Sequence, residues 1–588
     1  MSTAHQESPA DRLPLNDWQT TAADPALTAS LSSMLELPPP LAALLAARGH
    51  TDPAAAARFL APLDQKLTDP MQIDPVPEAV DRILHAIGRG GRIVVFGDFD
   101  ADGVVATAVL SDMIGAMGGN VRPFIPDRHT EGYGLTRAAL DRCLAEGIPD
   151  LLVTVDCGMG ATSLLAELHA RGVGLVVTDH HTLAGDFPDG CVVVNPRHGA
   201  PPAAAGGLCG AGIAFQLACG LVRRRGDRDD ERRRLGAWLD AVAIATVADV
   251  VPLLGDNRIL VACGLRRLNG RPRIGLSELM KKSAVSNIDV GSYHLGFVLG
   301  PRLNAAGRME SAEAAYKLLT TTDIDEARQL AILLDNANSL RRQTEEEVLA
   351  QAEEQLARWF DNRRHGAVVV GDAGWHPGTV GIVAARLQSR HQRPAAVIVR
   401  DGAGGGRGSV RAGQAHNAYD ALAACMPHLD RMGGHARAAG FSLKPGAFDA
   451  FREAFAAACR DQVGAVAVRP VLVVDGWLAG SDIGQKLLEG IGRLEPFGEG
   501  HQPPCWGLRG VVLRNKPIPM GAEGDHLRLA LNTADGVPLQ GVWFRGARFL
   551  PQFPAVGVAF DITGEIVANT YGGQTTPQLV VRDARMRS

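Results

Sequence analysis

Paired cysteines are missing from this chain of 588 residues. Its nine cysteines are scattered and none forms a C-x-x-C pair, which argues against a zinc ribbon and against a disulfide framework. No apolar run reaches the ~18 residues that a membrane span needs. The N-terminal segment, residues 1–20, contains acids and lacks the apolar core of a signal peptide. We therefore expect a protein of the reducing cytoplasm with no membrane-inserted part.

Aromatic residues and excess charge are scarce as well. Aromatic side chains make up 5% of the chain, and the net charge is −5. This balance gives no overall sign of nucleic-acid binding, so an enzyme acting on nucleic acid would need a local basic groove. The most charged stretch, RRRGDRDDERRR at 223–234, mixes both signs and is typical of a solvated loop or helix face.

Apolar strand patterns alternate with helical patterns in the first half of the chain, after an Ala-, Leu- and Pro-rich helical cap at 1–75. The alternation over 76–280 predicts a parallel sheet with helices on both faces. The expected strands are 92–97, 121–125, 151–155, 175–178 and 191–195, and the expected helices are 104–117, 137–146 and 163–171.

The second half begins with a long helical pattern. Residues 323–360 contain no Gly or Pro and predict a connecting helix within a linker at 281–364. A second α/β unit is expected at 365–465, and closely spaced short strands at 466–588 predict a small barrel or sandwich. The predicted architecture is two α/β lobes joined by a long helix, followed by a β-barrel.

Acidic and imidazole side chains follow apolar runs at four places, which we read as four strand ends, the last being 242–247. Because the carboxyl ends of parallel strands line one crevice, these side chains are expected to converge. Divalent cations would relieve the repulsion among them, and an oxygen-rich set with histidine suits Mn²⁺ or Mg²⁺ better than zinc. The residues are Asp98, Asp100, Asp102, Asp156, Asp179, His180, His181 and Asp249.

Each cluster alone has a simpler explanation. A lone D-x-D after a strand is more often a helix cap or a turn, and a lone His-His pair is equally ambiguous. Four such clusters, each directly after an apolar run, are hard to explain as caps. We therefore interpret them as one metal centre.

The ordered motifs resemble those of a known superfamily. GDFDADG (97–103), TVDCG (154–158), TDHH (178–181) and TVADVVPL (246–253) are similar to the motifs of DHH phosphoesterases. Across nearly the whole chain, further segments resemble the RecJ family of single-strand-specific 5′→3′ exonucleases. They are IPDRHTEGYGL (125–135), GPRLNAAGRM (300–309), WHPGTVGIVAAR (375–386), GSVR (408–411), GGHARAAG (433–440) and PFGEGHQPP (496–504). The departures are small: Ala412 stands where the family often has serine, and His501 where asparagine is usual.

The resemblance implies a DHH domain at 76–280, a DHHA1 domain at 365–465 and an OB-like barrel at 466–588. It also implies a phosphodiesterase with two Mn²⁺ or Mg²⁺ ions, able to activate a bridging water and to hold the leaving oxygen. The histidine that binds metal and the one that acts on the phosphate stay undistinguished, and the roles of Asp98 and Asp179 beside the ligands stay open. The ligands carried over are Asp100, Asp102, Asp156, His180 or His181, and Asp249, with Asp98 counted among the candidates.

A pocket for the 5′-phosphate is a further implication of the resemblance. Arg128, Arg308, Ser409 and Arg411 match its residues, and a guanidinium fork suits phosphate. Arg302 is the rival to Arg308. For any one arginine alone, a surface ion pair with a neighbouring acid is the competing explanation.

Two histidines are added to the substrate-binding set. His435 follows two glycines that let backbone approach DNA closely, although an ordinary turn also explains them. His376 precedes a helix whose N–H groups can face a phosphate. In the barrel, single-strand binding uses stacking aromatics; the candidates, half of which are expected in the barrel core, are Trp506, Trp543, Phe544 and Phe497.

The expected function is a single-stranded-DNA-specific exonuclease that works 5′→3′ and releases 5′-mononucleotides in DNA repair and recombination. A single-strand-binding protein and a repair helicase are the expected partners, and we expect a monomer. Two alternatives remain. A small-nucleotide phosphodiesterase of the same superfamily is typically shorter and lacks the barrel, and a non-catalytic DNA-binding scaffold would have lost ligands that are intact here.

Overall fold

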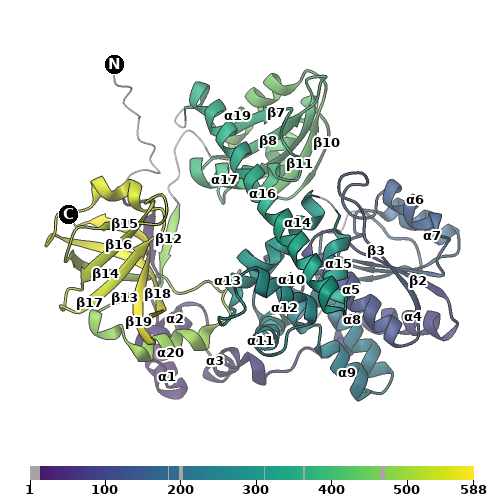
Figure 1. Cartoon of the computed structure of the whole chain (residues 1–588), viewed down its shortest axis with the longest axis horizontal. Helices are drawn as coiled ribbons and strands as arrows, with labels where there is room; N and C mark the ends of the chain where they lie inside the picture. Colours follow the sequence, from purple (N-terminus) through teal and green to yellow (C-terminus); the bar gives the residue numbers. More distant parts are fainter. Residues whose placement is uncertain are drawn as a thin grey trace. The chain divides into compact units, whose positions relative to one another are not determined.

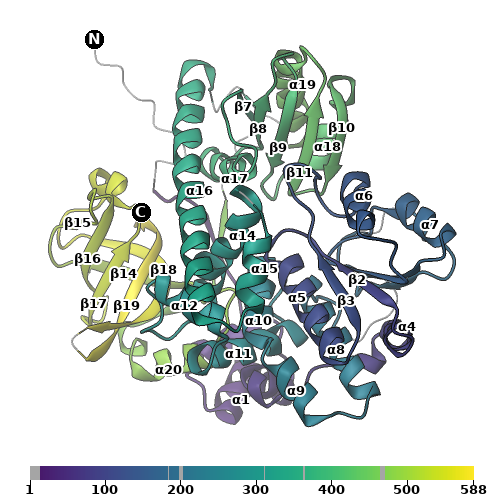
Figure 2. The same ribbon diagram turned by 45° about the vertical axis from the view of Figure 1, so that its right-hand side comes forward.

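The structure, a computed structural model, describes residues 13–182, 185–197, 203–309, 311–361, 365–463, 470–571 and 573–587 (Figures 1 and 2). Most of the N-terminal segment that lacks a signal-peptide pattern lies outside these residues. The chain divides into two compact units. The first unit comprises Ala61–Arg341 and Glu495–Gln502, and the second unit comprises Met1–Leu60, Arg342–Leu494 and Pro503–Ser588.

A five-stranded parallel sheet forms the centre of the first unit, with strand order β3-β2-β4-β5-β6. The predicted parallel sheet is therefore confirmed, and each predicted strand agrees with an observed one to within a residue at either end. The strands are β2 (Arg92–Phe96), β3 (Asn120–Phe124), β4 (Leu151–Val155), β5 (Gly174–Thr178) and β6 (Val192–Val194).

Helices cover both faces of this sheet. Alternate residues of each strand point to opposite faces, so the apolar strands present apolar side chains on both. Ile93 and Val95 pack in the larger core with α4, α5 and α8, whereas Val94 and Phe96 pack with α6 and α7 on the other face (Figure 2). These helices are α4 (Val76–Gly88), α5 (Ala101–Ala116), α6 (Arg137–Ala145), α7 (Thr162–Ala170) and α8 (Gly210–Arg224).

The run at 242–247, expected to be a strand, is instead part of helix α10 (Leu239–Ala248). A short apolar run does not distinguish a buried helix from a buried strand, and alanine-rich AVAIATVA is compatible with close packing of a helix against α5 and α11. Asp249 thus stands at a helix C-terminus, not at a strand end. The remaining helices of this unit are α9 (Asp229–Gly236), α11 (Gly255–Gly270), α12 (Ile274–Lys282), α13 (Ser292–His294), η4 (Leu295–Leu299), α14 (Gly300–Met309) and α15 (Glu313–Thr320).

The charged stretch at 223–234 is the end of α8 together with most of α9. Its arginines pair with acids of neighbouring helices, as in the contacts from Arg224 to Asp81 at 2.6 Å and from Arg234 to Asp112 at 2.5 Å. The stretch is a solvated, ion-paired helix surface, as expected. The predicted connecting helix is α16, Ile324–Trp359, 36 residues long.

The second unit contains a five-stranded mixed sheet of order β10-β11-β9-β8-β7, in which only β7 and β8 are parallel. Helices α18 and α19 pack on one face, and α17 with the later part of α16 packs on the other. The second α/β lobe is confirmed. Its elements are β7 (Val368–Asp372), α17 (Val380–His391), β8 (Ala395–Arg400), β9 (Gly406–Arg411), α18 (Ala418–Ala423), β10 (Leu429–Gly434), β11 (Ala438–Leu443) and α19 (Phe448–Val463).

A closed barrel follows in the same unit. Strands β14, β18, β19, β17 and β16 pair in that order, and β16 pairs back with β14, which gives the five-stranded closure of an OB-like barrel. Its elements are β13 (Gly476–Leu478), α20 (Gln485–Leu494), β14 (Trp506–Leu513), β15 (Ile518–Met520), β16 (His526–Asn532), β17 (Pro538–Trp543), η7 (Ala547–Gln552), β18 (Ala559–Tyr571) and β19 (Gln574–Met586).

The N-terminal segment packs against this barrel region. Strand β1 (Asp17–Thr20) pairs with β12 (Val471–Val474), and Trp18 donates its indole N–H to Asp583 of β19. The predicted helical character is seen in α1 (Pro25–Leu35), α2 (Pro39–Ala47) and α3 (Pro53–Leu60).

Candidate metal centre

Sharp turns at the strand ends bring the acidic side chains of the first unit together. Asp156 follows β4 with a φ of +60°, and Gly210 at the start of α8 lies so close that a Cβ there would be 2.4 Å from the Cβ of Asp156. A Cβ on Gly103 would likewise lie 2.6 Å from the backbone nitrogen of Asp98. Glycine at these two positions lets the loop after β2 and the start of α8 approach the carboxylates.

Three overlapping groups of ligand atoms result, and within each group the atoms lie within 4.8 Å of one another. They are Asp98, Asp100 and Asp156; Asp102, His180 and Asp249; and Asp156, His180 and His181. Every candidate ligand from the sequence takes part in at least one group. Asp156 and His180 each belong to two groups, which suits a centre that holds two ions.

His180 lies at the middle of this arrangement. Its Nε2 is 3.2 Å from Asp156 Oδ1, 3.5 Å from Asp249 Oδ2 and 3.9 Å from Asp102 Oδ2. Burial lowers the pKa of His180 to about 4, although the charge of Asp102 opposes the shift. A neutral imidazole facing three carboxylates is the form that can coordinate a metal.

Buried polar atoms at the centre lack hydrogen-bond partners among the described residues. One carboxylate oxygen each of Asp156 and Asp249 and both ring nitrogens of His180 are in this condition. Burial raises the pKa of Asp98, with the charge of Asp100 adding to it, and burial and Asp102 raise that of Asp249 to about 9. Unpaired buried carboxylates are costly, so this donor set fits divalent cations with oxygen and imidazole ligands.

His181 has a different environment from its neighbour. Its Nδ1 lies 2.7 Å from Asp179, and Asp179 also accepts backbone N–H groups from Met159, His180 and His181. Burial would lower the pKa of His181, but the hydrogen bond with Asp179 raises it. Its Nε2 is 3.3 Å from the hydroxyl of Tyr133. Asp179 therefore orients His181 and favours its protonated form.

Two of the candidate ligands also cap helices. Asp100 accepts the N–H groups of Asp102 and Gly103 at the start of α5. Asp102 accepts those of Gly210 and Ala211 at the start of α8, at 2.6 and 2.8 Å. The capping explanation considered from the sequence is therefore true of these two residues, and it coexists with their place in the acidic cluster. The GGLCGAG stretch at 206–212 leads into α8, which begins at Gly210.

Sequence reasoning missed the residues that hold the loop after Asp249. Leu253 donates its N–H to the carbonyl of Glu499 at 2.8 Å, and buried Arg258 donates to the carbonyls of Glu495 and Pro496. The carbonyls of Pro496 and Glu499 belong to the PFGEGHQPP motif, and that of Glu495 directly precedes it; the motif in the sequence was the available signal. The pairing itself joins parts of the chain about 240 residues apart and has no local signature.

Arg128 lies over the ring of Phe99, 5.0 Å from its centroid. Burial lowers the pKa of Arg128, and the charges of Asp98 and Asp100 oppose that shift, so the guanidinium stands beside the acidic centre. Asn304, which the sequence reasoning did not single out, accepts the N–H of Ala101 at 2.7 Å.

The rival arginines of α14 differ in their surroundings. Arg302 donates to Asp335 at 2.9 Å and to the carbonyl of Val298 at 2.7 Å, which matches the ion-pair explanation. Arg308 stands in the last turn of α14, next to Gly307, where a Cβ would lie 2.5 Å from the carbonyl oxygen of Phe99. Of the two arginines, Arg308 is thus the one nearer the GDFDADG loop.

The other substrate-binding candidates belong to the second unit. Arg411 donates to the hydroxyl of Ser409 at 2.7 Å, and its guanidinium lies 3.1 Å from where a Cβ on Gly381 of α17 would be. His376 lies before that helix and accepts the N–H of Gly378. His435 is exposed in the turn between β10 and β11.

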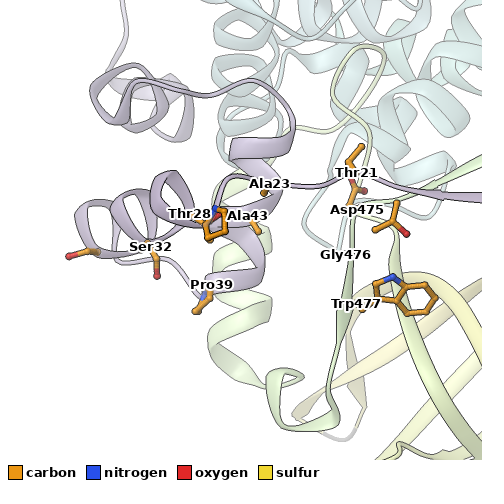
Figure 3. A pocket seen from close by; sticks show the side chains of 13 residues that line it. Thr21, Ala23, Thr28, Ser32, Pro39, Ala43, Asp475, Gly476 and Trp477 are labelled. Atoms are coloured by element: carbon orange, nitrogen blue, oxygen red, sulfur yellow. The ribbon is translucent and has the colours of Figure 1, made fainter.

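The four aromatic candidates divide as expected. Trp506 and Trp543 are buried in the barrel core, whereas Phe544 is exposed. Phe497 stacks on His501 within the short segment Glu495–Gln502 that belongs to the first unit. A separate, mainly apolar cavity of about 700 Å³ lies between α1, α2 and β13, with Thr28, Pro39 and Trp477 in its lining (Figure 3). None of the predicted site residues lines it.

Comparisons with known proteins bear on all three domains. Family models match at residues 92–246 (DHH family, N-terminal domain), 365–461 (DHHA1 domain) and 474–583 (RecJ OB domain). The single-stranded-DNA-specific exonuclease RecJ of Dickeya dadantii is 34% identical over 93% of this chain and 96% of that protein. The chain belongs to the RecJ family. The RecJ exonuclease of Bacillus subtilis is 33% identical over 96% of this chain and 70% of its own length.

Solved RecJ structures extend the likeness to the fold. RecJ from Thermus thermophilus in complex with Mn²⁺ has a TM-score of 0.82 and 29% identity, covering 97% of this RecJ-family chain and 80% of that chain. The complex of the same protein with Mg²⁺ has a TM-score of 0.76 and 28% identity, over 97% and 79%. The two metals in these relatives are those expected from the donor set. Among the described helices, none has the length and hydropathy to cross a membrane.

Proposed function

We propose that this chain is a metal-dependent exonuclease that degrades single-stranded DNA from its 5′ end and releases 5′-mononucleotides. The observation that carries the reaction type is the cluster of buried carboxylate and imidazole atoms without hydrogen-bond partners among the described residues. The RecJ relatives, each named a single-stranded-DNA-specific exonuclease, support the substrate class.

The acidic cluster would hold two Mn²⁺ or Mg²⁺ ions. Bound there, such ions supply an activated water and charge stabilisation for the leaving oxygen of an in-line displacement. We assign His180 as a ligand, because its Nε2 faces three carboxylates and its pKa is lowered. The full proposed ligand set is Asp98, Asp100, Asp102, Asp156, His180 and Asp249.

His181 serves as the general acid in this proposal. The water oxygen bonds to phosphorus, the P–O3′ bond breaks, and the proton of His181 goes to the 3′ oxygen of the departing nucleotide. Asp179 holds the ring through Nδ1, which leaves Nε2 for the substrate. The new 5′ end carries a phosphate, so each product strand is again a substrate.

The terminal phosphate is bound by arginines in this proposal. Arg128 beside the acidic centre and Arg308 at the end of α14 supply charge from the first unit. In the second unit, Ser409 and Arg411 of β9, linked by their hydrogen bond, are the residues proposed to bind phosphate. His376 and His435 are proposed to contact the strand further along. Charge-assisted contacts of this kind favour phosphate.

The wider setting is also a proposal. We place the activity in DNA repair and recombination, with a single-strand-binding protein and a repair helicase as partners and a cytoplasmic monomer as the working form. The domain limits proposed for the chain remain 1–75, 76–280, 281–364, 365–465 and 466–588.

A chain-length series of 5′-labelled strands tests the proposal. With Mn²⁺ present, a 20-mer should yield labelled mononucleotide as the first product, and a blunt duplex of the same sequence should resist. Hydrolysis of only dinucleotides or cyclic dinucleotides would favour a small-nucleotide phosphodiesterase instead. Binding without hydrolysis would favour a scaffold. Asp156→Asn should abolish product, and persistence of hydrolysis in EDTA would contradict the metal centre.

A further inference from the structure

An exposed pair of aromatic rings, to which no role has been assigned so far, stands on the first unit. Tyr293 on α13 is 67% exposed and Phe297 on η4 is 72% exposed. Their ring centroids are 5.1 Å apart, with an angle of 27° between the planes, which is a stacked arrangement. Two adjacent solvent-facing rings of this size are unusual on a surface, because their burial against a ligand would be favourable.

The helix that carries this pair reaches the metal centre. Residues 292–309 form one continuous helical stretch, α13, η4 and α14, beside α10 (Figure 1). On one side, a Cβ on Gly296 would lie 3.2 Å from Val247, and one on Gly300 would lie 3.0 Å from Ala248. These two contacts seat the stretch against the last turn of α10, directly before Asp249.

The helical stretch that carries the aromatic residues continues to the residues near the metal loop. Phe297 precedes Asn304 by seven residues and Tyr293 precedes it by eleven along this stretch. Asn304 accepts the N–H of Ala101 in the GDFDADG loop. Arg308 is one turn further along α14.

We propose that Tyr293 and Phe297 form a stacking platform for bases of the single strand, a few nucleotides downstream of the bond that is cleaved. The inference rests on the proposed exonuclease function and names a binding subsite for it. Seven residues of helix rise about 10 Å. At ~3.4 Å for each stacked nucleotide this is roughly three nucleotides. A face of every base can stack on an aromatic ring, so the platform is sequence-tolerant, as an exonuclease requires.

A helical detail supports a specific role for this position. The turn that carries Phe297, Leu295–Leu299, is a π-helix. Such turns are rare inside helices and occur often at functional sites. The wider turn lets Gly296 and Gly300 stay on α10 while Phe297 stays in line with Tyr293 and remains exposed.

The experiment compares long and short substrates. Initial rates would be measured in Mn²⁺ for wild type, Tyr293→Ala and Phe297→Ala on a 5′-phosphorylated 20-mer and on a 5′-phosphorylated dinucleotide. Removing one stacking ring should lower kcat/KM on the 20-mer by roughly 5- to 150-fold. The dinucleotide is too short to reach the platform and should react at the wild-type rate. Tyr419→Ala, which removes an aromatic ring that is 44% exposed on α18, is the matched control.

Two further measurements separate stacking from simple packing. Phe297→Trp should keep the rate on the 20-mer, whereas Phe297→Leu should lose about as much as Phe297→Ala. A 20-mer with abasic sites at about the third to fifth nucleotides should already be slow with wild type, and Phe297→Ala should slow it little more. Equal losses on the 20-mer and the dinucleotide would overturn the proposal. So would unchanged rates on both, which would instead indicate a protein-docking surface.

The platform and the exonuclease function can fail separately. Fluorescence anisotropy of a labelled 20-mer, with Asp156→Asn as the background, measures binding without hydrolysis. Suppose that wild type has no hydrolytic activity, that Asp156→Asn binds the strand, and that adding Phe297→Ala to Asp156→Asn lowers this affinity. The enzymatic proposal then fails and the platform is supported. If wild type hydrolyses the 20-mer and Phe297→Ala changes neither rate nor affinity, the platform is refuted alone.

Discussion

Asp249→Asn should remove a pH dependence from the stability of the metal-free chain. Burial, and next the charge of Asp102, raise the pKa of Asp249 to about 9. In an unfolded chain an aspartate titrates near ~3.9. Between these values the folded state binds one more proton than the unfolded state. The free energy of unfolding therefore falls as the pH rises through this window, from about pH 4 to about pH 9.

The size of this effect follows from proton linkage. One extra proton in the folded state changes the free energy of unfolding by about 1.4 kcal/mol per pH unit. Between pH 6 and pH 8 the metal-free wild type should therefore lose roughly 2–3 kcal/mol through Asp249. Asparagine keeps the size of the side chain but has no such proton. The free energy of unfolding of Asp249→Asn should therefore not show this decrease between pH 6 and pH 8.

Urea unfolding in EDTA at pH 6, 7 and 8 measures the decline. Asp141→Asn, a surface aspartate on α6 with a side chain 62% exposed, is the control and should behave as wild type. A metal ion bound beside Asp249 favours the carboxylate, so Mn²⁺ should flatten the wild-type decline and stabilise wild type more at pH 8 than at pH 6. Identical pH dependence in wild type and Asp249→Asn would refute the reasoning.

Three other changes test separate parts of the site. Gly210→Ala places a Cβ 2.4 Å from that of Asp156, so it should cost ~1–3 kcal/mol in urea unfolding and most of the hydrolysis rate. Asp179→Asn removes the carboxylate charge that helps to raise the pKa of His181; the alkaline limb of the pH–rate profile should move to lower pH while Mn²⁺ affinity stays near wild type. Arg411→Ala should slow hydrolysis of 5′-phosphorylated strands by roughly 10- to 100-fold and affect 5′-hydroxyl strands much less; equal losses on both would make Arg411 a general backbone contact.

Strand ends were the part of the site that local sequence could predict. The apolar runs of β2, β4 and β5 stop at Asp98, Asp156 and Asp179, and a parallel sheet must bring such ends to one edge. Asp249 was also placed correctly in the cluster, but for a wrong reason. The run before it is a helix, because alanine-rich sequence packs closely between α5 and α11 where a strand was expected.

Side-chain roles needed the fold. The motif alone does not distinguish two adjacent histidines, whereas the structure gives His180 three carboxylate neighbours and pairs His181 Nδ1 with Asp179. The same holds for the arginines of α14. Only the position of Asp335 on α16, 33 residues away, shows that Arg302 is ion-paired.

The feature of the metal centre that is hardest to predict from sequence is that residues 495–502 hold the loop after Asp249 in place. The chain leaves the first unit within α16, builds most of the second unit, and then returns to place this short segment against the loop after Asp249. Arg258, whose pKa is lowered to about 10 by burial, satisfies the carbonyls of Glu495 and Pro496 there. A buried guanidinium without those acceptors would be costly. Truncation before Glu495 would therefore remove the barrel and also the segment that holds the loop after Asp249, a proposed metal ligand. Loss of activity in such a truncation would thus not by itself measure DNA binding by the barrel.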